Sequence, residues 1–270
     1  MCWEIIASIH IKEILLPWIL TQRSPATTQH SLESRLSPAA KATTAQYIYN
    51  LEQTFTRSIL TNNDSRGFPD WESLYDNQQV ESMPWYSEKL DPDLDEEISN
   101  GKLSVKGRFL DLGTGPATQA VQVAKKGFTV TGSDISKSAI YRAMKVYVNE
   151  PNIIFIVDNI LDSTIKDDEY DYIFDRGCFH VFQPEDRPRY VREIKRILKK
   201  DGMLFLKCFS SKEKRDEGPY RFSKSQVSKI FENEEFKIER IKETVYQGTL
   251  DPLPKALFVV LTNHKSITRQ

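Results

Sequence analysis

Residues 107–118 read GRFLDLGTGPAT, a short apolar run that carries one acid, Asp111, and ends in a pair of glycines. Gly113 and Gly115 let the backbone turn sharply and come close to a ligand. Residues 118–127 then have the apolar spacing of a helix. The segment therefore predicts a strand, a tight turn and a helix, in that order.

The alternation of strand and helix patterns extends from this segment to about residue 263. We expect strands at 107–112, 128–134, 152–158, 170–175, 201–209, 236–246 and 255–263. We expect helices at 118–127, 136–150, 184–200 and 223–234, with Ser136 and Ser223 as N-cap residues. Such alternation favours a parallel, doubly wound sheet, whereas the last two strands, with no helix between them, favour a hairpin. The sequence predicts an α/β fold: a Rossmann-like, mostly parallel seven-stranded sheet with a C-terminal antiparallel hairpin and helices on both faces.

Composition narrows the class of protein. The 270 residues carry 37 basic and 38 acidic side chains, a balance that argues against a nucleic-acid binder with a broad basic face. No apolar run reaches the ~20 residues that a membrane-spanning helix needs. Cys2, Cys178 and Cys208 have neither a disulfide framework nor the spacing of zinc ligands. We expect a cytoplasmic monomer that acts on a small molecule, with no metal, no nucleic acid and no membrane span.

The chain divides into two parts by composition. Residues 1–66 are expected to be an extension that is partly helical or loosely ordered, and residues 67–264 a single catalytic domain. The extension is rich in Ser, Thr, Ala and Gln after residue 20, and its role stays open between a targeting segment, a mis-assigned start and a docked helix. An apolar stripe at helical spacing predicts a packing face at its end: Tyr47, Leu51, Phe55 and Ile59.

The second strand supplies the next element of a site. It closes on Asp134, 19 residues after Gly115, and in a doubly wound sheet ligands bind at the carboxyl ends of the strands. A carboxylate there accepts hydrogen bonds from ribose hydroxyls, which indicates an adenosine-type cofactor. A dinucleotide site would need a glycine at Thr118 and no acid beside the turn, because pyrophosphate is anionic. Asp111 instead suits the ammonium group of S-adenosylmethionine, which carries no phosphate.

Residues 105–262 resemble the class I S-adenosylmethionine-dependent methyltransferases. The family motif is acid-x-Gly-x-Gly-x-Gly, and the chain has Ala117 at the third glycine. The resemblance implies that the glycine turn faces the methionine part, that Asp134 holds the ribose, and that Asp158 accepts from the adenine amino group. A turn or helix cap is the alternative for Asp158. The cofactor-binding residues implied are Trp85, Asp111, Gly113, Thr114, Gly115, Asp134, Ile135, Asp158, Asn159, Ile160 and Asp175.

Further motifs resemble the thiopurine, thiol and halide methyltransferases, whose general plan tellurite-resistance methyltransferases share. They are DRG at 175–177, GPYRFSKSQVSKIFE at 218–232, WESLY at 71–75, MPW at 83–85 and PDL at 92–94. In those enzymes a Trp-x3-Trp and a Pro-Trp fold over the methyl donor. Here Tyr75 replaces the second Trp, and Tyr86 stands where that group usually has Asp. The resemblance implies substrate contacts from Trp71, Tyr75 and Arg176; the alternative is that the aromatic residues only pack on the core.

The predicted function is methyl transfer from S-adenosylmethionine, with S-adenosylhomocysteine as product (EC 2.1.1 class). The most favoured acceptor is a thiol or another soft nucleophile, since a soft anion needs only to be held in line with the methyl group. Arg176 is expected to anchor an anionic group, and His180 to act either as a base or as a structural residue. Two alternatives stay open: an O- or N-methyltransferase of an acidic metabolite, and a non-catalytic S-adenosylmethionine-binding protein.

Overall fold

The computed structural model describes residues 70–101, 103–232 and 236–264. The predicted extension at 1–66 and the apolar stripe at its end lie outside these ranges.

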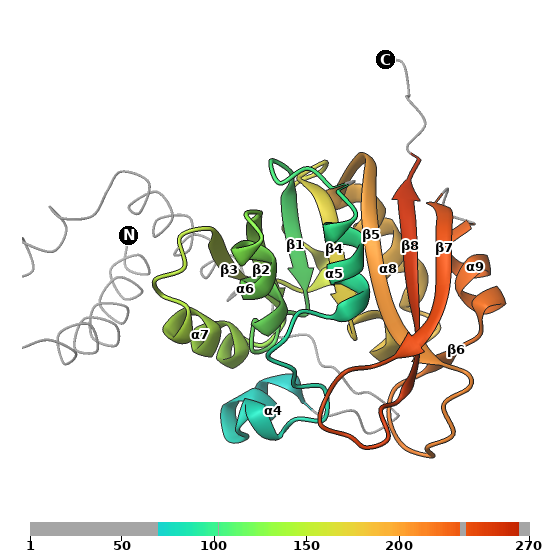
Figure 1. Cartoon of the computed structure of the whole chain (residues 1–270), viewed down its shortest axis with the longest axis horizontal. Helices are drawn as coiled ribbons and strands as arrows, with labels where there is room; N and C mark the ends of the chain where they lie inside the picture. Colours follow the sequence, from blue (N-terminus) through green and yellow to red (C-terminus); the bar gives the residue numbers. More distant parts are fainter. Residues whose placement is uncertain (1–69, 102, 233–235, 265–270) are drawn as a thin grey trace, which may run out of the picture. The chain divides into compact units, whose positions relative to one another are not determined.

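One sheet runs through the described part of the chain (Figure 1), with strand order β3-β2-β1-β4-β5-β8-β7. Its strands are β1 (Arg108–Leu112), β2 (Thr129–Asp134), β3 (Ile153–Val157), β4 (Tyr170–Arg176), β5 (Leu198–Ser210), β7 (Phe236–Val245) and β8 (Lys255–Asn263). The two-residue β6 (Arg221–Phe222) pairs with the end of β5. β8 is antiparallel to both neighbours, and the other pairings are parallel. The predicted mostly parallel sheet with its C-terminal hairpin is confirmed, and β6 is an addition to it.

Helices cover both faces of the sheet. They are α4 (Trp71–Asn77), α5 (Pro92–Ser99), α6 (Thr118–Lys125), α7 (Lys137–Val146), α8 (Arg187–Ile197) and α9 (Lys224–Glu232), with the 3-10 turns η1 (Val80–Ser82), η2 (Ile160–Asp162) and η3 (Phe179–Val181). The predicted N-caps are confirmed: the Ser136 hydroxyl accepts from the Ala139 N–H at 3.1 Å, and the Ser223 hydroxyl from the Gln226 N–H at 3.2 Å.

The core forms one apolar layer on each side of the sheet. Side chains of α5, α6 and α7 pack on one face, where the Phe205 ring of β5 stacks with Phe109 of β1 and with Phe258 of β8. Side chains of α8 and α9 pack on the other face, including fully buried Tyr190 and Phe231. Because helices cover both faces, a ligand can approach the sheet at the carboxyl ends of its parallel strands.

The predicted helix at 184–200 is wrong at both ends. The observed helix is α8, and Leu198 to Lys200 belong to β5. Leu198 takes an extended conformation with ψ 135° and is fully buried. The side-chain amide of Asn263 donates to three carbonyls at the end of this helix, those of Lys195, Leu198 and Lys199. A residue distant in sequence thus satisfies the end of the helix, which local periodicity does not reveal.

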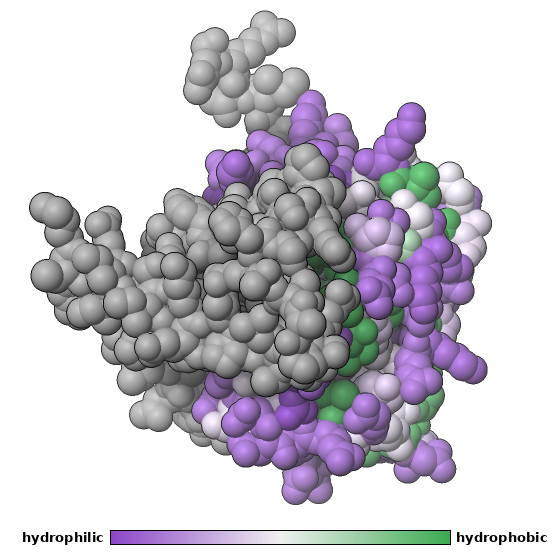
Figure 2. Space-filling view, turned by 90° about the vertical axis from the view of Figure 1, so that its left-hand side faces the viewer, coloured by the Kyte–Doolittle hydropathy of each residue, from purple (hydrophilic) through white to green (hydrophobic). Residues whose placement is uncertain are grey.

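Figure 2 shows a mostly hydrophilic surface with a few hydrophobic side chains between the polar ones. The large apolar side chains that are exposed within the described residues are Val105, Ile135, Tyr141, Val146, Val148 and Ile154. Four of these lie on or just after α7 and on β3. Within the same residues, no helix is both long and apolar enough to cross a bilayer.

Candidate functional site

The turn between β1 and α6 has a left-handed backbone at three positions. Gly113 has φ +66°, Gly115 φ +48° and Ala117 φ +59°. Glycine adopts this region freely, whereas alanine does so at a cost of about 1–2 kcal/mol. The glycine pair predicted from the motif is therefore needed for the shape of the turn. Ala117 occupies a position that also favours glycine.

Asp111 fastens this turn to the helix that follows it. One of its carboxylate oxygens accepts from the Thr114 hydroxyl at 2.6 Å and from the Ala120 N–H at 3.1 Å. The side chain is buried, and burial raises the pKa of Asp111 to about 7. A cationic group placed beside it would favour the ionised form.

Asp134 joins the end of β2 to the glycine turn. Its two oxygens accept from the Gly115 N–H and from the Ser136 N–H, each at 2.9 Å. Burial raises the pKa of Asp134 to about 6. The structure thus brings together the turn and the distal acid that the sequence predicted to share one cofactor.

Asp158, at the end of β3, has one satisfied and one unsatisfied oxygen. Oδ1 accepts from the N–H and the hydroxyl of Thr164 at 2.9 and 3.0 Å, while Oδ2 is buried without a hydrogen-bond partner. An unpaired buried acceptor is costly, which points to a donor supplied by a ligand. The adenine amino group is such a donor. Asp158 therefore fulfils the turn role with one oxygen and leaves the other for the predicted contact.

The other residues predicted near the adenine differ in exposure. Asn159 is exposed and caps η2 by accepting from the Leu161 N–H at 3.1 Å. Ile160 is buried in the core below it. Ile135 follows Asp134 and is 42% exposed, so its apolar side chain is open to a ligand.

Asp175 organises the loop after β4. It is fully buried and accepts four hydrogen bonds, from the N–H groups of Gly177, Cys178 and Phe179 and from the Tyr190 hydroxyl at 2.6 Å. Burial raises its pKa to about 6. A Cβ atom placed on Gly113 would lie 3.3 Å from that of Cys178, so this loop touches the glycine turn. Asp175 therefore fixes the loop at 177–179, which lies against the glycine turn. The contact with the methionine part that was predicted for Asp175 stays a prediction.

His180 is buried in a small aromatic group. Its Nδ1 accepts from the Phe209 N–H at 3.2 Å, and its ring stacks on Tyr246 with centroids 5.7 Å apart. Burial, and then the charge of Arg176, lower the pKa of His180 to about 3. The imidazole is therefore neutral near pH 7, and this pKa makes it a weak base. The structural alternative agrees with these contacts, and the role as a base stays a prediction.

Arg176 is surrounded by partners from three segments. Its guanidinium donates to Asp91 Oδ2 at 3.2 Å, to the Trp85 carbonyl at 3.0 Å and to the Gln247 carbonyl. It also lies over the Tyr246 ring, 4.5 Å from the centroid. These contacts direct the guanidinium at the protein, and the predicted anchoring of a substrate anion stays a prediction.

Helix α4 lies at the carboxyl end of β1 (Figure 1). Glu72 on this helix accepts from the Ser136 hydroxyl at 2.8 Å and from the Ser138 hydroxyl at 2.8 Å. Arg142 of α7 donates to two carbonyls at the end of α4, at 2.6 and 2.7 Å. Polar contacts at both ends thus dock α4 onto α7.

The aromatic residues of this region pack together above the glycine turn. The rings of Trp71 and Trp85 meet edge to face, with centroids 5.9 Å apart. Tyr75 is buried, and its hydroxyl lies where a Cβ atom of Gly115 would be. The aromatic cluster therefore packs as a group and also covers the turn that was predicted to hold the methionine part.

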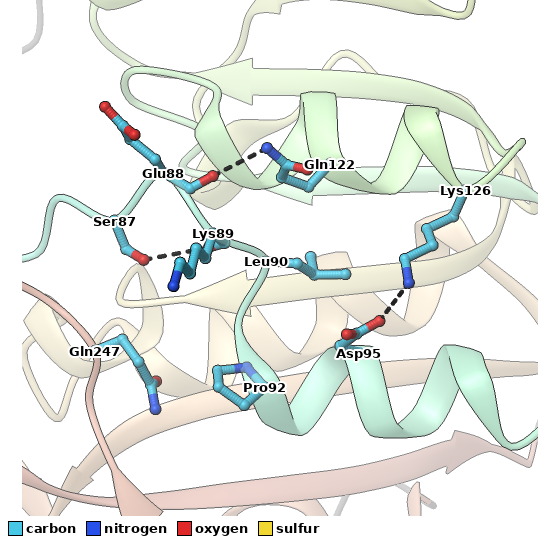
Figure 3. A pocket seen from close by; sticks show the side chains of 9 residues that line it. All are labelled: Ser87, Glu88, Lys89, Leu90, Pro92, Asp95, Gln122, Lys126 and Gln247. Carbon is cyan, nitrogen blue, oxygen red and sulfur yellow. Dashed lines mark hydrogen bonds and ion pairs between the residues drawn. The ribbon is translucent and has the colours of Figure 1, made fainter.

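A separate hollow of about 640 Å³ lies beside this region (Figure 3). An ion pair of 2.7 Å between Lys126 and Asp95 and a hydrogen bond from Gln122 to the Glu88 carbonyl join elements of its wall. Its lining is Ser87, Glu88, Lys89, Leu90, Pro92, Asp95, Gln122, Lys126 and Gln247. None of these is a predicted cofactor-binding residue, so the hollow is distinct from the cofactor site.

Sequence reasoning missed three residues around Arg176. Tyr246 donates its hydroxyl to the Arg176 carbonyl at 2.7 Å, and Asp91 and Lys207 form buried ion pairs. Lys207 had a signal, since it is a lone charge inside the apolar run 203–209. The others had none, because their partners lie 70 or more residues away in sequence.

The arrangement agrees with comparisons to known proteins. A methyltransferase domain family matches residues 109–202. A probable thiol methyltransferase of Arabidopsis thaliana is 30% identical over 195 residues, which cover 71% of this chain and 81% of that protein. A thiocyanate methyltransferase of Brassica oleracea is 27% identical over 180 residues, 65% of this chain and 77% of that protein.

Solved structures share the fold. One comes from work on the conversion of a disulfide bond into a thioacetal group during echinomycin biosynthesis. It matches with a TM-score of 0.63 and 20% sequence identity, and the match covers 72% of this chain and 92% of that one. A methyltransferase of Methanosarcina mazei has a TM-score of 0.58, 18% identity and coverage of 66% and 100%. The chain therefore belongs to the class I S-adenosylmethionine-dependent methyltransferases and resembles their thiol methyltransferase group.

Proposed function

We propose that this methyltransferase acts on a small thiol or a comparable soft nucleophile. The observation that carries the proposal is the burial and hydrogen bonding of the groups beside the glycine turn. His180 is buried and neutral, and Asp175 is enclosed by four hydrogen bonds. Burial keeps the pKa values of Cys178 and Tyr246 above their usual ranges. His180, Cys178 and Tyr246 are therefore poor proton acceptors near pH 7, and both oxygens of Asp175 already accept hydrogen bonds from the protein, which favours an acceptor that needs no base.

A thiol meets this condition because its anion forms in water near neutral pH. Free thiols have pKa values near ~8.5, and the thiolate is the nucleophile. When bound, S-adenosylmethionine supplies a methyl group that its sulfonium already activates. The thiolate sulfur would form a bond to the methyl carbon while the bond to the sulfonium breaks, and the electron pair stays with S-adenosylhomocysteine. The thiol proton goes to solvent before the transfer.

The aromatic surroundings support the same class of acceptor. Trp85 packs with Phe209 and Tyr246, and His180 adds a neutral ring to the group. Rings of this kind exclude water, and their faces attract a sulfonium cation by about 0.5–2 kcal/mol. The similarity to a probable thiol methyltransferase adds a second, independent reason.

The test is a competition between acceptors with mass-spectrometric detection of the methylated product and of S-adenosylhomocysteine. The panel contains hydrosulfide, aliphatic and aromatic thiols, thiocyanate, iodide, tellurite, phenols and amines. We expect S-methylated products to dominate. Turnover confined to phenols or amines would contradict the proposal in favour of an O- or N-methyltransferase. S-adenosylhomocysteine binding without turnover on any acceptor would favour a non-catalytic binding protein.

We further propose that residues 67–264 form the catalytic domain and that the protein is a cytoplasmic monomer. The described elements from Trp71 to Asn263 all belong to the sheet or to the layers on it, which supports these bounds. Light scattering coupled to size exclusion tests the monomer, and a dimer mass would overturn it.

A further inference from the structure

We propose that Lys207, Asp91 and Arg176 form a buried clamp that positions the segment Met83–Trp85 over the methyl donor, with Lys207 as a positioning residue for methyl transfer. The inference rests on the proposed function at this site. It assigns a role to a lysine that lies in the middle of an apolar strand and that no motif of the family singles out.

Lys207 is fully buried, and its ammonium group makes four short polar contacts. It donates to both oxygens of Asp91 at 2.7 and 2.6 Å, to Asp93 Oδ2 at 2.8 Å and to Gln247 Oε1 at 2.7 Å. A buried charge is tolerated only when it is paired and hydrogen-bonded, as it is here. Lys207 therefore fixes Asp91 at the N-terminus of α5, far from it in sequence.

Arg176 extends this contact toward the aromatic cluster. Asp91 bridges the two cations, because its Oδ2 accepts from Lys207 and from Arg176. Arg176 then donates to the carbonyls of Trp85 and Gln247. Gln247 is held at both its side chain and its main chain, by Lys207 and Arg176 respectively. One chain of contacts thus leads from the middle of β5 to the backbone of Trp85.

The loop between β7 and β8 closes the clamp from the other side. The Thr249 N–H donates to the Pro84 carbonyl at 3.0 Å. A Cβ atom on Gly248 would overlap that same carbonyl, so the two backbones touch at a position where only glycine fits. The segment Met83–Trp85 is therefore held by Arg176 and by this loop, and Gln247 joins the two supports.

The charges of the clamp cancel within the protein. Two cations, Lys207 and Arg176, face the carboxylates of Asp91 and Asp93, and Asp93 also accepts from Thr244 at 2.8 Å. Lys242, which is 40% exposed, approaches Asp93 at 3.0 Å from the surface. Because its charges are paired inside the protein, the clamp contributes little net electric field at the reacting atoms. It acts on the reaction by fixing the position of the segment Met83–Trp85. This distinguishes it from an anion anchor.

The experiment compares Lys207→Met with Lys199→Met. Lys199 lies on the same strand and pairs with Asp171 at 2.7 Å, but it is remote from the clamp, so it controls for the loss of an ion pair. Lys207→Met leaves two buried carboxylates short of a partner and can fail to fold. The double variant Lys207→Met/Asp93→Asn removes one charge of each sign and keeps the cluster balanced.

Two measurements accompany melting curves. The first is steady-state kinetics, in which kcat and KM are determined separately for an uncharged and an anionic thiol. The affinity for S-adenosylhomocysteine is measured alongside it. The second is acrylamide quenching of Trp71 and Trp85 in a background where Trp3 and Trp18 are replaced by Phe. For the double variant we expect kcat to fall about 10- to 100-fold for both thiols, since a shift of ~1 Å in reacting groups costs on that order. We expect quenching to increase in that variant and both quantities to stay unchanged in Lys199→Met.

Several results would overturn the clamp. A folded double variant with unchanged kcat and unchanged quenching would do so. A rise in KM for the anionic thiol alone would also do so, because it would make Arg176 an anion anchor. If the wild-type protein methylated no thiol, the proposed function would fail on its own. Quenching and S-adenosylhomocysteine affinity would then still decide whether the clamp positions Trp85.

Discussion

The two halves of the site handle charge in opposite ways. At the ends of β1, β2 and β3, which we term the donor end, three buried carboxylates have raised pKa values, and one oxygen of Asp158 has no hydrogen-bond partner among the described residues. At the ends of β4, β5 and β7, termed the acceptor end, Arg176, Lys207 and Asp91 neutralise one another inside the protein. At the donor end, an oxygen of Asp158 has no partner in the described part of the protein and can accept a hydrogen bond from a ligand. At the acceptor end, Arg176 donates its hydrogen bonds to the backbone carbonyls of Trp85 and Gln247.

This difference has a chemical reason. A cofactor with an ammonium, a ribose and an adenine is recognised by hydrogen bonds, so its site needs unsatisfied acceptors. A small soft nucleophile offers few hydrogen-bonding groups. Its reaction rate therefore depends mostly on how well it is positioned in line with the methyl group. Five predictions test this difference, in order of decreasing expected effect.

The largest effect is expected for Asp134→Asn at the donor end. The amide would place a donor against the N–H of either Gly115 or Ser136, and it would also weaken the acceptor for the ribose hydroxyls. Hydrogen bonds to charged groups contribute about 1.5–3 kcal/mol, so we expect S-adenosylhomocysteine affinity to fall about 100-fold. Calorimetry measures this. Asp167→Asn, a surface change that only removes an ion pair with Arg196, is the control, and equal affinity for both variants would contradict the assignment.

A smaller effect, about tenfold in affinity, is expected for Asp158→Asn, because one acceptor for the adenine amino group is lost. Burial raises the pKa of Asp158, so its charge is disfavoured in the ligand-free protein. The melting temperature should therefore stay the same or rise without ligand and fall relative to wild type with S-adenosylhomocysteine bound. A parallel fall in both states would show that Asp158 acts only as a turn residue toward Thr164.

The pH dependence should separate the two ends, with effects of several-fold. The raised pKa values of Asp111 and Asp134, about 7 and 6, mean that these carboxyls lose their protons as pH rises through that range. A bound cation favours the ionised form, so S-adenosylmethionine should bind more tightly as pH rises from about 5.5 to 8, with proton release. Calorimetry in two buffers of different ionisation enthalpy measures that release. Affinity independent of pH would place the cation elsewhere.

His180, at the acceptor end, should contribute no such step. His180, with its pKa lowered to about 3, is neutral from pH 5 upward. At saturating S-adenosylmethionine, kcat with an aromatic thiol that is already ionised should be flat across the same range. A step near pH 6.5 that disappears in His180→Gln would identify His180 as a titrating base and would contradict the buried, neutral imidazole, whereas a step that persists in that variant would belong to Asp175, whose pKa is about 6.

The smallest effect is expected for Ala117→Gly. Relief of the left-handed backbone, about 1–2 kcal/mol, offsets the loss of a buried methyl group, about 0.8 kcal/mol, and the greater freedom of glycine in the unfolded chain. The free energy of unfolding should change by less than about 1 kcal/mol. Ala120→Gly, at an equally buried position inside α6, should cost about 2 kcal/mol in denaturant unfolding. Equal losses at both positions would contradict the strain at Ala117.

The donor end was largely predictable from sequence because its parts are local. Gly113 and Gly115 follow directly on a strand, and Asp134 and Asp158 end the next two strands, so the parallel order of the sheet brings them to one edge. Strand and helix periodicity gave the elements, since each buries one face or stripe. The end of α8 was misplaced because Asn263, 66 residues after Ile197, satisfies its carbonyls.

The acceptor end was decided by tertiary structure. The sequence placed Arg176 and His180 at the end of β4 and suggested chemical roles from residue type alone. The fold gave Arg176 its partners by bringing Asp91, Lys207 and Gln247 from three distant segments to one buried point, where paired charge costs least. Burial likewise lowered the pKa of His180. The cofactor was predicted from sequence motifs that are local in the chain, and the family comparisons agree with it. The surroundings of Arg176 and His180 depend on packing, because burial and charge pairing exist only in the folded chain.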